Sequence, residues 1–402
     1  MNRTDSKIKF VGLHAHSVAG SIFDAIGYPQ AHMDFCYKNG GDALALTDHG
    51  NMNGLAYQVL HAKKMKEEGK EFKPIFGCEA YFIPSVEEWR EEYTRAMEDK
   101  KLARSAKKDE QSGATVEDEG ASKKTQDVLR KRNHLVLLVQ NQTGLNNLFK
   151  LVSESYQSEN FYRYPRIDYR LLKKYNEGII AASACLGGVY AGDYWENRDE
   201  GPEAVLAAMR NTTERMVDVF GDRWYAEIQW NNIEEQHQLN QFVIQTAQEM
   251  GVALITTADS HYPNPDAWKD RELYKRLGWL GKGRPSWAEE ESQLPAGVEE
   301  IGYELYPKNG DQMWESYKQY SEEQGFEYDD DLILKSIEET HRIAHDRIET
   351  FLPDNTVRLP EFVVPAGFTA AQALVNYALE GLKDRGLHKN KEYVERLKLE
   401  RH

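Results

Sequence analysis

Residues 8–16 have the sequence IKFVGLHAH, a short apolar run that ends in two histidines one residue apart. Successive side chains of an extended segment alternate between its two faces, so His14 and His16 face the same side and can reach one metal ion. Similar apolar runs recur along the chain, and most of them end beside another potential metal ligand. This recurrence guides the prediction of the fold.

Seven such runs alternate with stretches of helical character. They are Ile8–Leu13, Ala43–Thr47, Pro74–Ile83, His134–Val139, Ile179–Ala182, Trp224–Ile228 and Val252–Thr257. Alternating strands and helices predict an α/β fold with a parallel sheet and right-handed crossovers. Such a sheet can close into a barrel or stay open, and the positions of the candidate ligands favour the closed form.

The candidate ligands cluster where strands are expected to end. They are His14, His16, Asp24, His49, Glu79, His134, Cys185, Asp259 and His261. In a closed β/α barrel the C-terminal ends of all strands meet at one mouth, where such enzymes place their chemistry. His134 is the exception, because it begins its run; it needs a shifted strand boundary or an approach from a loop to reach the mouth.

Several of the candidates also have a purely structural explanation. The histidine pair could belong to the core, and Cys185 could be a small buried hydrophobic residue. Asp24 and Asp259 could cap helices, and the DHG sequence at 48–50 could form a turn. Core packing does not require all of these residue types beside predicted strands, so their recurrence favours a metal site.

The number and chemistry of the side chains indicate more than one ion. Zinc usually takes four ligands, so nine candidates predict two or three divalent ions, with the Glu79 carboxylate as the bridge. Imidazole, carboxylate and thiolate together suit Zn²⁺, Mn²⁺ or Fe²⁺. Clustered ions suit phosphate-ester hydrolysis, because they generate hydroxide and stabilise both oxygens of the displacement. Glu79, His14, His16 and Asp259 are the candidate catalytic residues.

Composition limits the classes of protein and partner. The 402 residues carry a formal charge of −16, which is unusual for a protein that grips DNA through many phosphates. The N-terminus lacks the apolar core of a signal peptide, and no apolar run approaches the length that spans a bilayer. Three cysteines without a CxxC pair argue against a disulfide framework. We expect a cytoplasmic protein with no membrane partner.

The chain is expected to divide into two regions. Residues 1–265 form the predicted barrel, interrupted by a charged insertion at 86–132 that is either a helix or a solvated loop. Residues 266–402 lose the strand pattern and form a mostly helical region. Long helical patterns cover Asp331–Ile348 and Thr369–Arg385.

Six short motifs resemble the metal motifs of the PHP (polymerase and histidinol phosphatase) family. They are HAH (14–16), TDHG (47–50), GCE (77–79), NHL (133–135), SAC (183–185) and ADSH (258–261). Residues 8–263 resemble, more closely, the N-terminal part of bacterial DNA polymerase III alpha subunits, and SIEETHRIAHDRI (336–348) continues this resemblance. The resemblance implies a distorted, TIM-like (β/α)7 barrel with a trinuclear site and a proofreading 3′–5′ exonuclease activity.

The chain ends at VERLKLERH (394–402), before the palm motifs of such polymerases would begin, so we expect no nucleotide polymerisation by this chain alone. The expected partners are single-stranded or frayed 3′ ends of DNA, and also a separate polymerase palm and fingers chain and other replisome subunits. Two other functions stay open: hydrolysis of a small phosphate monoester, as by histidinol phosphatase, and a catalytically silent scaffold for a split polymerase.

DNA contacts are expected in the segment FYRYPRID (161–168), where Arg163 and Arg166 alternate with Tyr162 and Tyr164. Arginine beside aromatic rings suits phosphate capture and base stacking. The same segment could instead be a structural loop.

Overall fold

The protein is described by a computed structural model, which covers residues 3–22, 24–109, 131–280, 304–354, 356–357, 359 and 362–400. The chain divides into two compact units, Met1–Pro353 and Asp354–His402. Each unit is described by itself.

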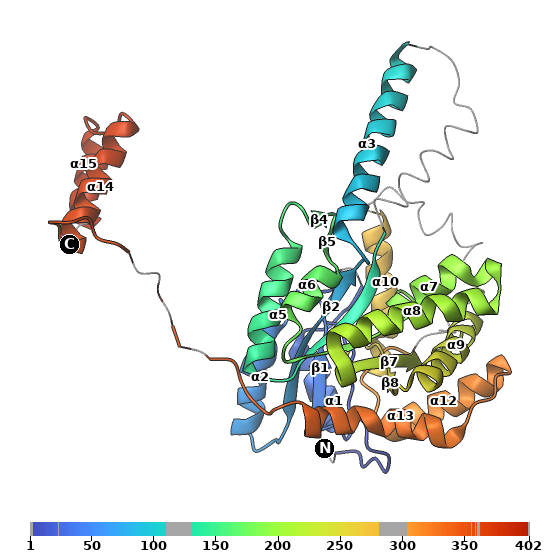
Figure 1. Cartoon of the computed structure of the whole chain (residues 1–402). Helices are drawn as coiled ribbons and strands as arrows, with labels where there is room; N and C mark the ends of the chain where they lie inside the picture. Colours follow the sequence, from blue (N-terminus) through green and yellow to red (C-terminus); the bar gives the residue numbers. More distant parts are fainter. Residues whose placement is uncertain are drawn as a thin grey trace. The chain divides into compact units, whose positions relative to one another are not determined.

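The first unit contains a curled sheet surrounded by helices (Figure 1). Its strands are β1 (Ala43–Leu46), β2 (Lys73–Phe82), β3 (Asn133–Val139), β4 (Phe161–Tyr162), β5 (Tyr164–Ile167), β6 (Ile179–Ala182), β7 (Trp224–Gln229) and β8 (Ala253–Thr257). Its α-helices up to β8 are α1 (Pro29–Lys38), α2 (Leu55–Glu67), α3 (Val86–Asp109), α5 (Gln142–Ser155), α6 (Tyr169–Tyr175), α7 (Val189–Asn197), α8 (Pro202–Phe220) and α9 (Glu234–Met250). The predicted α/β class is confirmed.

The sheet is mixed rather than parallel. Its strands follow the order β4-β5-β2-β3-β6-β7-β8, with β1 paired to β2. The pairs β1–β2, β6–β7 and β7–β8 are parallel, but β3 is antiparallel to both β2 and β6. The expectation of a parallel sheet was therefore wrong at β3, because an apolar run does not reveal the direction in which its strand is inserted.

The first apolar run, Ile8–Leu13, forms no strand of its own, but residues 12–16 close the sheet. On one side Gly12 and Ala15 accept hydrogen bonds from Ala45 and Thr47 (2.8 and 2.7 Å). On the other side Ser260, just after β8, accepts from the amide of His16 (2.7 Å) and donates to the carbonyl of His14 (3.1 Å). This segment joins the two edges of the sheet, and the result is the distorted barrel that was predicted.

The barrel has apolar packing on both faces of its strands. Along β3, Leu135, Leu137 and Val139 belong to one buried cluster, whereas Val136 and Leu138 belong to another. Strands covered on both sides are typically continuous apolar runs, as here.

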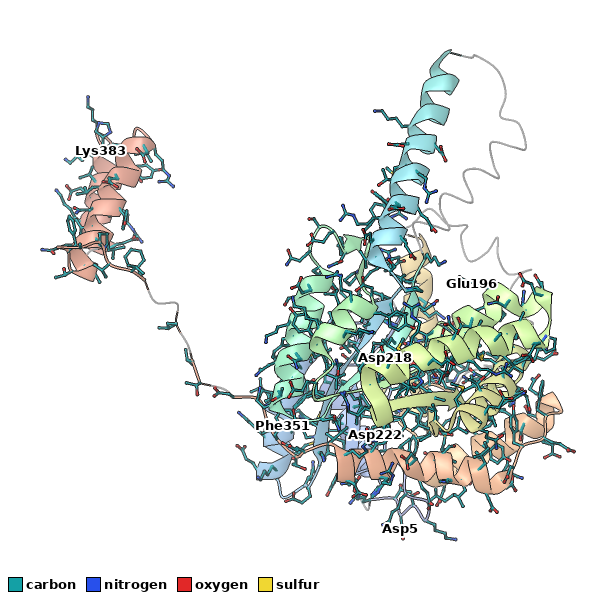
Figure 2. All side chains as sticks on the ribbon, viewed as in Figure 1. Asp5, Glu196, Asp218, Asp222, Phe351 and Lys383 are labelled. Atoms are coloured by element: carbon teal, nitrogen blue, oxygen red, sulfur yellow. The ribbon has the colours of Figure 1, made fainter. Side chains whose placement is uncertain are left out.

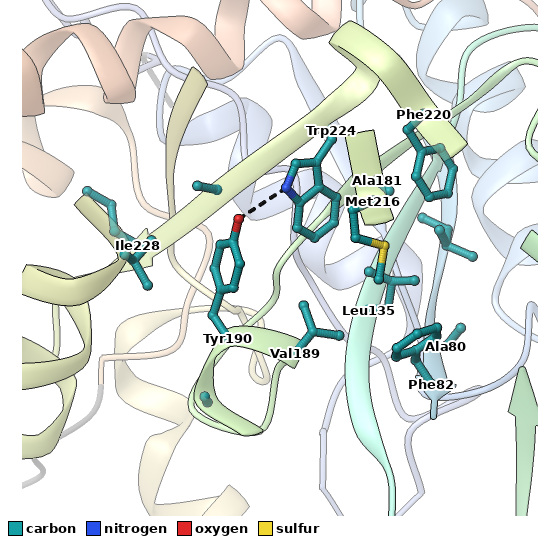
Figure 3. Close-up of a cluster of buried hydrophobic side chains, with 14 of the residues drawn as sticks. Ala80, Phe82, Leu135, Ala181, Val189, Tyr190, Met216, Phe220, Trp224 and Ile228 are labelled. Atoms are coloured by element: carbon teal, nitrogen blue, oxygen red, sulfur yellow. Dashed lines mark hydrogen bonds between the residues drawn. The ribbon is translucent and has the colours of Figure 1, made fainter. Parts of the chain in front are cut away.

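Figure 3 shows part of the cluster that contains Leu135, where side chains of α7 and α8 meet the sheet. There the Trp224 indole donates a hydrogen bond to the Tyr190 hydroxyl (3.1 Å), which satisfies a polar group inside an apolar layer.

The helices after β8 remain part of the first unit. They are α10 (Trp268–Leu280), α12 (Gly310–Gln324) and α13 (Asp330–Arg342), followed by a π-helical turn, Ile343–Arg347. Ile333 and Ile337 of α13 are fully buried in the core that also contains strand residues. The domain boundary predicted near residue 265 was therefore placed too early; the contacts change at 353/354.

The end of the first unit is tied to the sheet by specific contacts. Phe351 packs edge-on against Phe76 of β2, with ring centroids 5.6 Å apart. Arg347 pairs with Asp222 at 2.8 Å, and Phe351 and Asp222 are both labelled in Figure 2. These contacts explain why the compact unit extends to Pro353.

The charged insertion begins as α3, which extends away from the sheet (Figure 1). Buried Val86 and Trp89 anchor its first turns. The helical part of the predicted insertion is confirmed, while residues 110–130 lie outside the described residues.

The second unit contains α14 (Ala370–Asp384) and α15 (Lys391–Glu400). Thr369 caps α14 in a reciprocal capping box with Gln372. With α10, α12 and α13, these helices confirm a mostly helical C-terminal region. Among the residues that the structure describes, no helix is both long and apolar enough to cross a membrane.

Candidate metal centre

The structure brings all nine predicted ligands to one end of the barrel. His49, Cys185 and Asp259 follow the C-terminal ends of β1, β6 and β8. His134 lies at the N-terminal end of β3, but β3 is antiparallel to its neighbours, so its first residues lie at the same mouth. The inverted strand, rather than a shifted boundary or a loop, explains the position of His134.

Glu79 of β2 lies at the centre of the group and is fully buried. One carboxylate oxygen is 3.3 Å from His14 Nε2 and 3.0 Å from His134 Nδ1. The other is 2.6 Å from His49 Nδ1 and 3.5 Å from His16 Nε2. A carboxylate with two imidazoles on each oxygen has the arrangement expected of a bridging ligand.

Asp259 and Asp24 connect the remaining imidazoles. Asp259 Oδ1 lies 3.1 Å from His16 Nε2, 3.3 Å from His14 Nε2 and 3.5 Å from His261 Nδ1. Asp24 Oδ2 lies 3.3 Å from His261 Nε2. Asp259 has a positive φ of 47°, a conformation that non-glycine residues rarely adopt and that occurs preferentially at functional sites.

Cys185 belongs to the loop that follows β6. Its sulfur lies 3.8 Å from His134 Nδ1 and 4.0 Å from a Glu79 oxygen. Burial, together with the carboxylates of Asp259 and Glu79, raises the thiol pKa well above its ordinary value. A bound cation would reverse this effect, because metal coordination stabilises the thiolate.

Three residues that were not predicted as site residues support the group. Glu227 of β7 accepts a 2.7 Å hydrogen bond from His14 Nδ1 and so directs Nε2 toward Glu79 and Asp259. Arg271 of α10 holds Asp24 through a 2.9 Å side-chain contact. The third residue is Asp48.

Asp48 stabilises the loop after the first run. It accepts hydrogen bonds from the Ser17 amide (2.6 Å) and from the hydroxyls of Ser17 and Ser21 (both 2.9 Å). Ser21 in turn contacts His16 Nδ1 at 3.2 Å. Asp48 therefore positions the loop instead of facing the mouth.

The charges within the group are mutually dependent. Burial disfavours a charged Glu79, but the neighbouring His134, His14 and His49 hold its pKa well below the ordinary value. Burial likewise lowers the pKa of His49, yet Glu79 and Asp24 together raise it to about 10. In the metal-free site, protonated imidazole therefore balances the ionised carboxylates, and a bound cation would take over this role.

The donor set fits metal ions. Several buried atoms make no hydrogen bond although polar neighbours are close: His14 Nε2, His16 Nε2, His49 Nδ1, Glu79 Oε2 and Asp259 Oδ1. Three overlapping sets bring their ligand atoms within 4.8 Å of one another: His14/His16/Asp259, His16/His49/His261 and His49/Glu79/His134. Unsatisfied buried polar atoms call for a partner, and bound cations would satisfy all of these.

The mouth opens into a cavity of about 270 Å³. Its lining combines candidate ligands with amide, basic and apolar side chains: Asp24, His49, His134, Cys185, Leu186, Gln229, Asn231, Gln236, Asp259, His261, Arg271, Lys275 and Leu305. This volume lies near the lower limit of about 300 Å³ for ordinary ligand pockets, so it suits a small group or the end of a chain.

The segment predicted to contact DNA has a different character. Arg166 is completely buried, and its guanidinium donates to the carbonyls of Lys131, Tyr162 and Tyr164 (3.1, 2.8 and 3.1 Å). The prediction that Arg166 binds substrate is therefore corrected, because its donors hold the β4–β5 hairpin. Arg163 is exposed, with its guanidinium 5.6 Å from the ring centroid of Tyr162.

Known proteins are similar to this chain in sequence. The chain is 32% identical to the DNA polymerase III subunit alpha of Aquifex aeolicus (strain VF5), over 97% of this chain and 29% of that protein. It is 30% identical to the subunit of the same name from Borreliella burgdorferi, over 94% of this chain and 27% of that protein. The chain thus spans less than a third of the length of these relatives.

A solved amidohydrolase from Chromobacterium violaceum aligns with 66% of this chain and 96% of its own chain, at 15% sequence identity and a TM-score of 0.32. The model of the PHP domain, in contrast, matches residues 12–231, which include the barrel-mouth motifs up to Cys185. Because that match covers more than half of the chain, the protein belongs to the PHP family.

Proposed function

We propose that this chain is a metal-dependent phosphodiesterase that removes nucleotides from the 3′ end of DNA. The observation that carries the proposal is the position of Glu79, a fully buried carboxylate with four imidazole nitrogens within 3.5 Å of its two oxygens. Divalent ions bound here would supply hydroxide near neutral pH and neutralise charge on a phosphate ester.

The residues of the chain prepare the site for such ions. Glu227 accepts a hydrogen bond from His14 Nδ1, which favours the tautomer whose Nε2 lone pair can bind an ion. Arg271 neutralises one oxygen of Asp24 and leaves the other facing His49 and His261. His14 and Asp24 are thereby oriented toward the mouth before substrate arrives.

The cavity supports a chain end as substrate. Its small volume accepts a terminal group more readily than a continuous duplex. Gln229 and Asn231 line the wall with amide groups that can hydrogen-bond to a sugar or base, and Lys275 adds positive charge for a phosphate. The 3′ direction is supported by the relatives named as polymerase subunits, since a hydrolytic site in such a protein would meet growing 3′ ends.

The test uses a single-stranded oligonucleotide labelled at its 5′ end, incubated with the protein and manganese or zinc. We expect a ladder of shortened labelled products from the wild type and none from Glu79→Gln. Glu214→Gln, the same substitution at an exposed position of α8, is the matched control and should degrade the oligonucleotide normally.

Other outcomes would contradict the proposal in distinguishable ways. If the protein binds ions and leaves the oligonucleotide intact but hydrolyses a small phosphate monoester, it is a phosphomonoesterase. If the protein binds ions but catalyses neither reaction, it is a scaffold for a separate polymerase chain. Immediate release of the labelled terminal nucleotide would reverse the direction of degradation.

A further inference from the structure

A second group of metal-ligand side chains lies at the opposite end of β1 from the mouth. Asp42 directly precedes β1, whereas His49 follows it. His341 of α13 and His345 of the π-helical turn lie beside Asp42, and the ligand atoms of these three residues fall within 4.8 Å of one another. None of them takes part in the barrel-mouth site.

The geometry of the two histidines suits chelation. They are four residues apart, so their side chains lie on the same side of consecutive turns. Their ring centroids are 4.3 Å apart, and His345 Nε2 lies 3.3 Å from Asp42 Oδ1. Two imidazoles and one carboxylate provide three protein ligands and leave room for water on an exposed ion.

The backbone beneath the group is held in place. Thr340 accepts a hydrogen bond from the Val11 amide (3.1 Å), which fixes the last turn of α13. The buried ammonium of Lys73 donates to the carbonyls of Ala344 and Ile348 (2.6 and 2.5 Å) on either side of His345. A π-helical turn is rare and occurs often at functional sites; here it carries His345.

We propose that Asp42, His341 and His345 bind one divalent transition-metal ion of the zinc class. This donor set matches zinc, which accepts imidazole nitrogen and carboxylate oxygen and completes its shell with water. The ion would cross-link the C-terminal end of α13 to the segment that enters β1. It would therefore brace the base of the barrel, independently of the ions at the mouth.

The full-length protein can be tested with zinc chloride as the probe and histidine modification by diethyl pyrocarbonate as the readout, resolved by peptide mass spectrometry. Zinc is expected to protect His341 and His345 together, with a single midpoint. His388, an exposed histidine of the second unit, is the internal control and should react equally with and without zinc.

Substitutions then separate coordination from simple shielding. Asp42→Asn keeps the size of the side chain but removes its charge, so the zinc midpoint should rise at least about 10-fold. His345→Asn should abolish the protection of His341, with the circular dichroism spectrum unchanged. Unaltered modification of His341 and His345 in zinc up to about 1 mM would overturn the proposal, as would an unshifted midpoint in Asp42→Asn.

Discussion

Glu227 illustrates how a residue outside the ligand group can control it. Its buried carboxylate is 2.7 Å from His14 Nδ1 and also accepts hydrogen bonds from Gln229 and Thr257 (3.1 and 2.5 Å). Glu227→Gln keeps the shape but can present an amide hydrogen to His14 and reverse its tautomer. We expect metal affinity and hydrolysis to fall about 10- to 100-fold.

Metal-competition titration would measure the effect on affinity, with Glu214→Gln as the control. Equal affinity in Glu227→Gln and the wild type would show that Glu227 does not orient His14.

Asp193 of α7 predicts a pH dependence of stability away from the mouth. Burial raises the pKa of its carboxyl to about 7, and one of its oxygens has no hydrogen-bond partner among the described residues. The folded protein therefore holds a proton that the unfolded chain loses near pH 4, so stability falls as pH rises from about 4 to about 7.

Asp193→Asn should remove this slope and raise the free energy of unfolding above pH 7 by roughly 2 kcal/mol, below the full linkage value because the site is partly accessible. Urea unfolding at pH 5 and pH 8 measures the difference. The same pH dependence in variant and wild type would contradict the assignment.

At the residue scale, the sequence patterns predicted the candidate ligands better than they predicted the residues that surround them. HAH and ADSH carry alternating ligands and TDHG carries His49, all at predicted strand ends, and the barrel brings them together. Glu227 was missed because one acidic residue in a short strand can equally face solvent. Arg166 was misassigned because an arginine among tyrosines has the same pattern whether its guanidinium is exposed or buried.

At the scale of elements, the contact between α5 and the turn before β6 depends on two glycines. A Cβ at Gly144 would lie 1.8 Å from the carbonyl oxygen of Gly178, a backbone atom that cannot move without shifting β6. Gly144→Ala should destabilise the protein by about 1–3 kcal/mol, the usual range for overpacking. Thr143→Ala, at the exposed neighbouring position, is the control for urea unfolding; equal stability of both variants would contradict the close contact.

The direction of strand β3 could not be predicted from the sequence. The run His134–Val139 is apolar throughout, and nothing in its composition distinguishes an antiparallel from a parallel neighbour. The pairing of β3 with β2 and β6 decides this, and it depends on distant residues. A ligand at the start of a run, such as His134, was the available signal that this strand is inverted.

At the scale of the molecule, all candidate ligands and their supporting residues lie within Met1–Pro353. The sequence placed the boundary near 265 because the strand pattern stops there, but buried residues of α13 show that later helices complete the core. A chain of residues 1–353 should therefore keep the main thermal transition and the metal stoichiometry of the full chain. Differential scanning calorimetry and metal analysis check both; unfolding or lost ions in the shorter chain would contradict this division.

The central claim is that the barrel mouth is a multinuclear metal centre bridged by Glu79. Anomalous diffraction at the absorption edge of manganese or zinc, from crystals grown with that metal, tests it most directly. We predict at least two anomalous peaks at coordination distance from the mouth ligands, about 2.0–2.3 Å, with Glu79 contacting more than one. Crystals with metal present but no peak beside Glu79 would contradict the account.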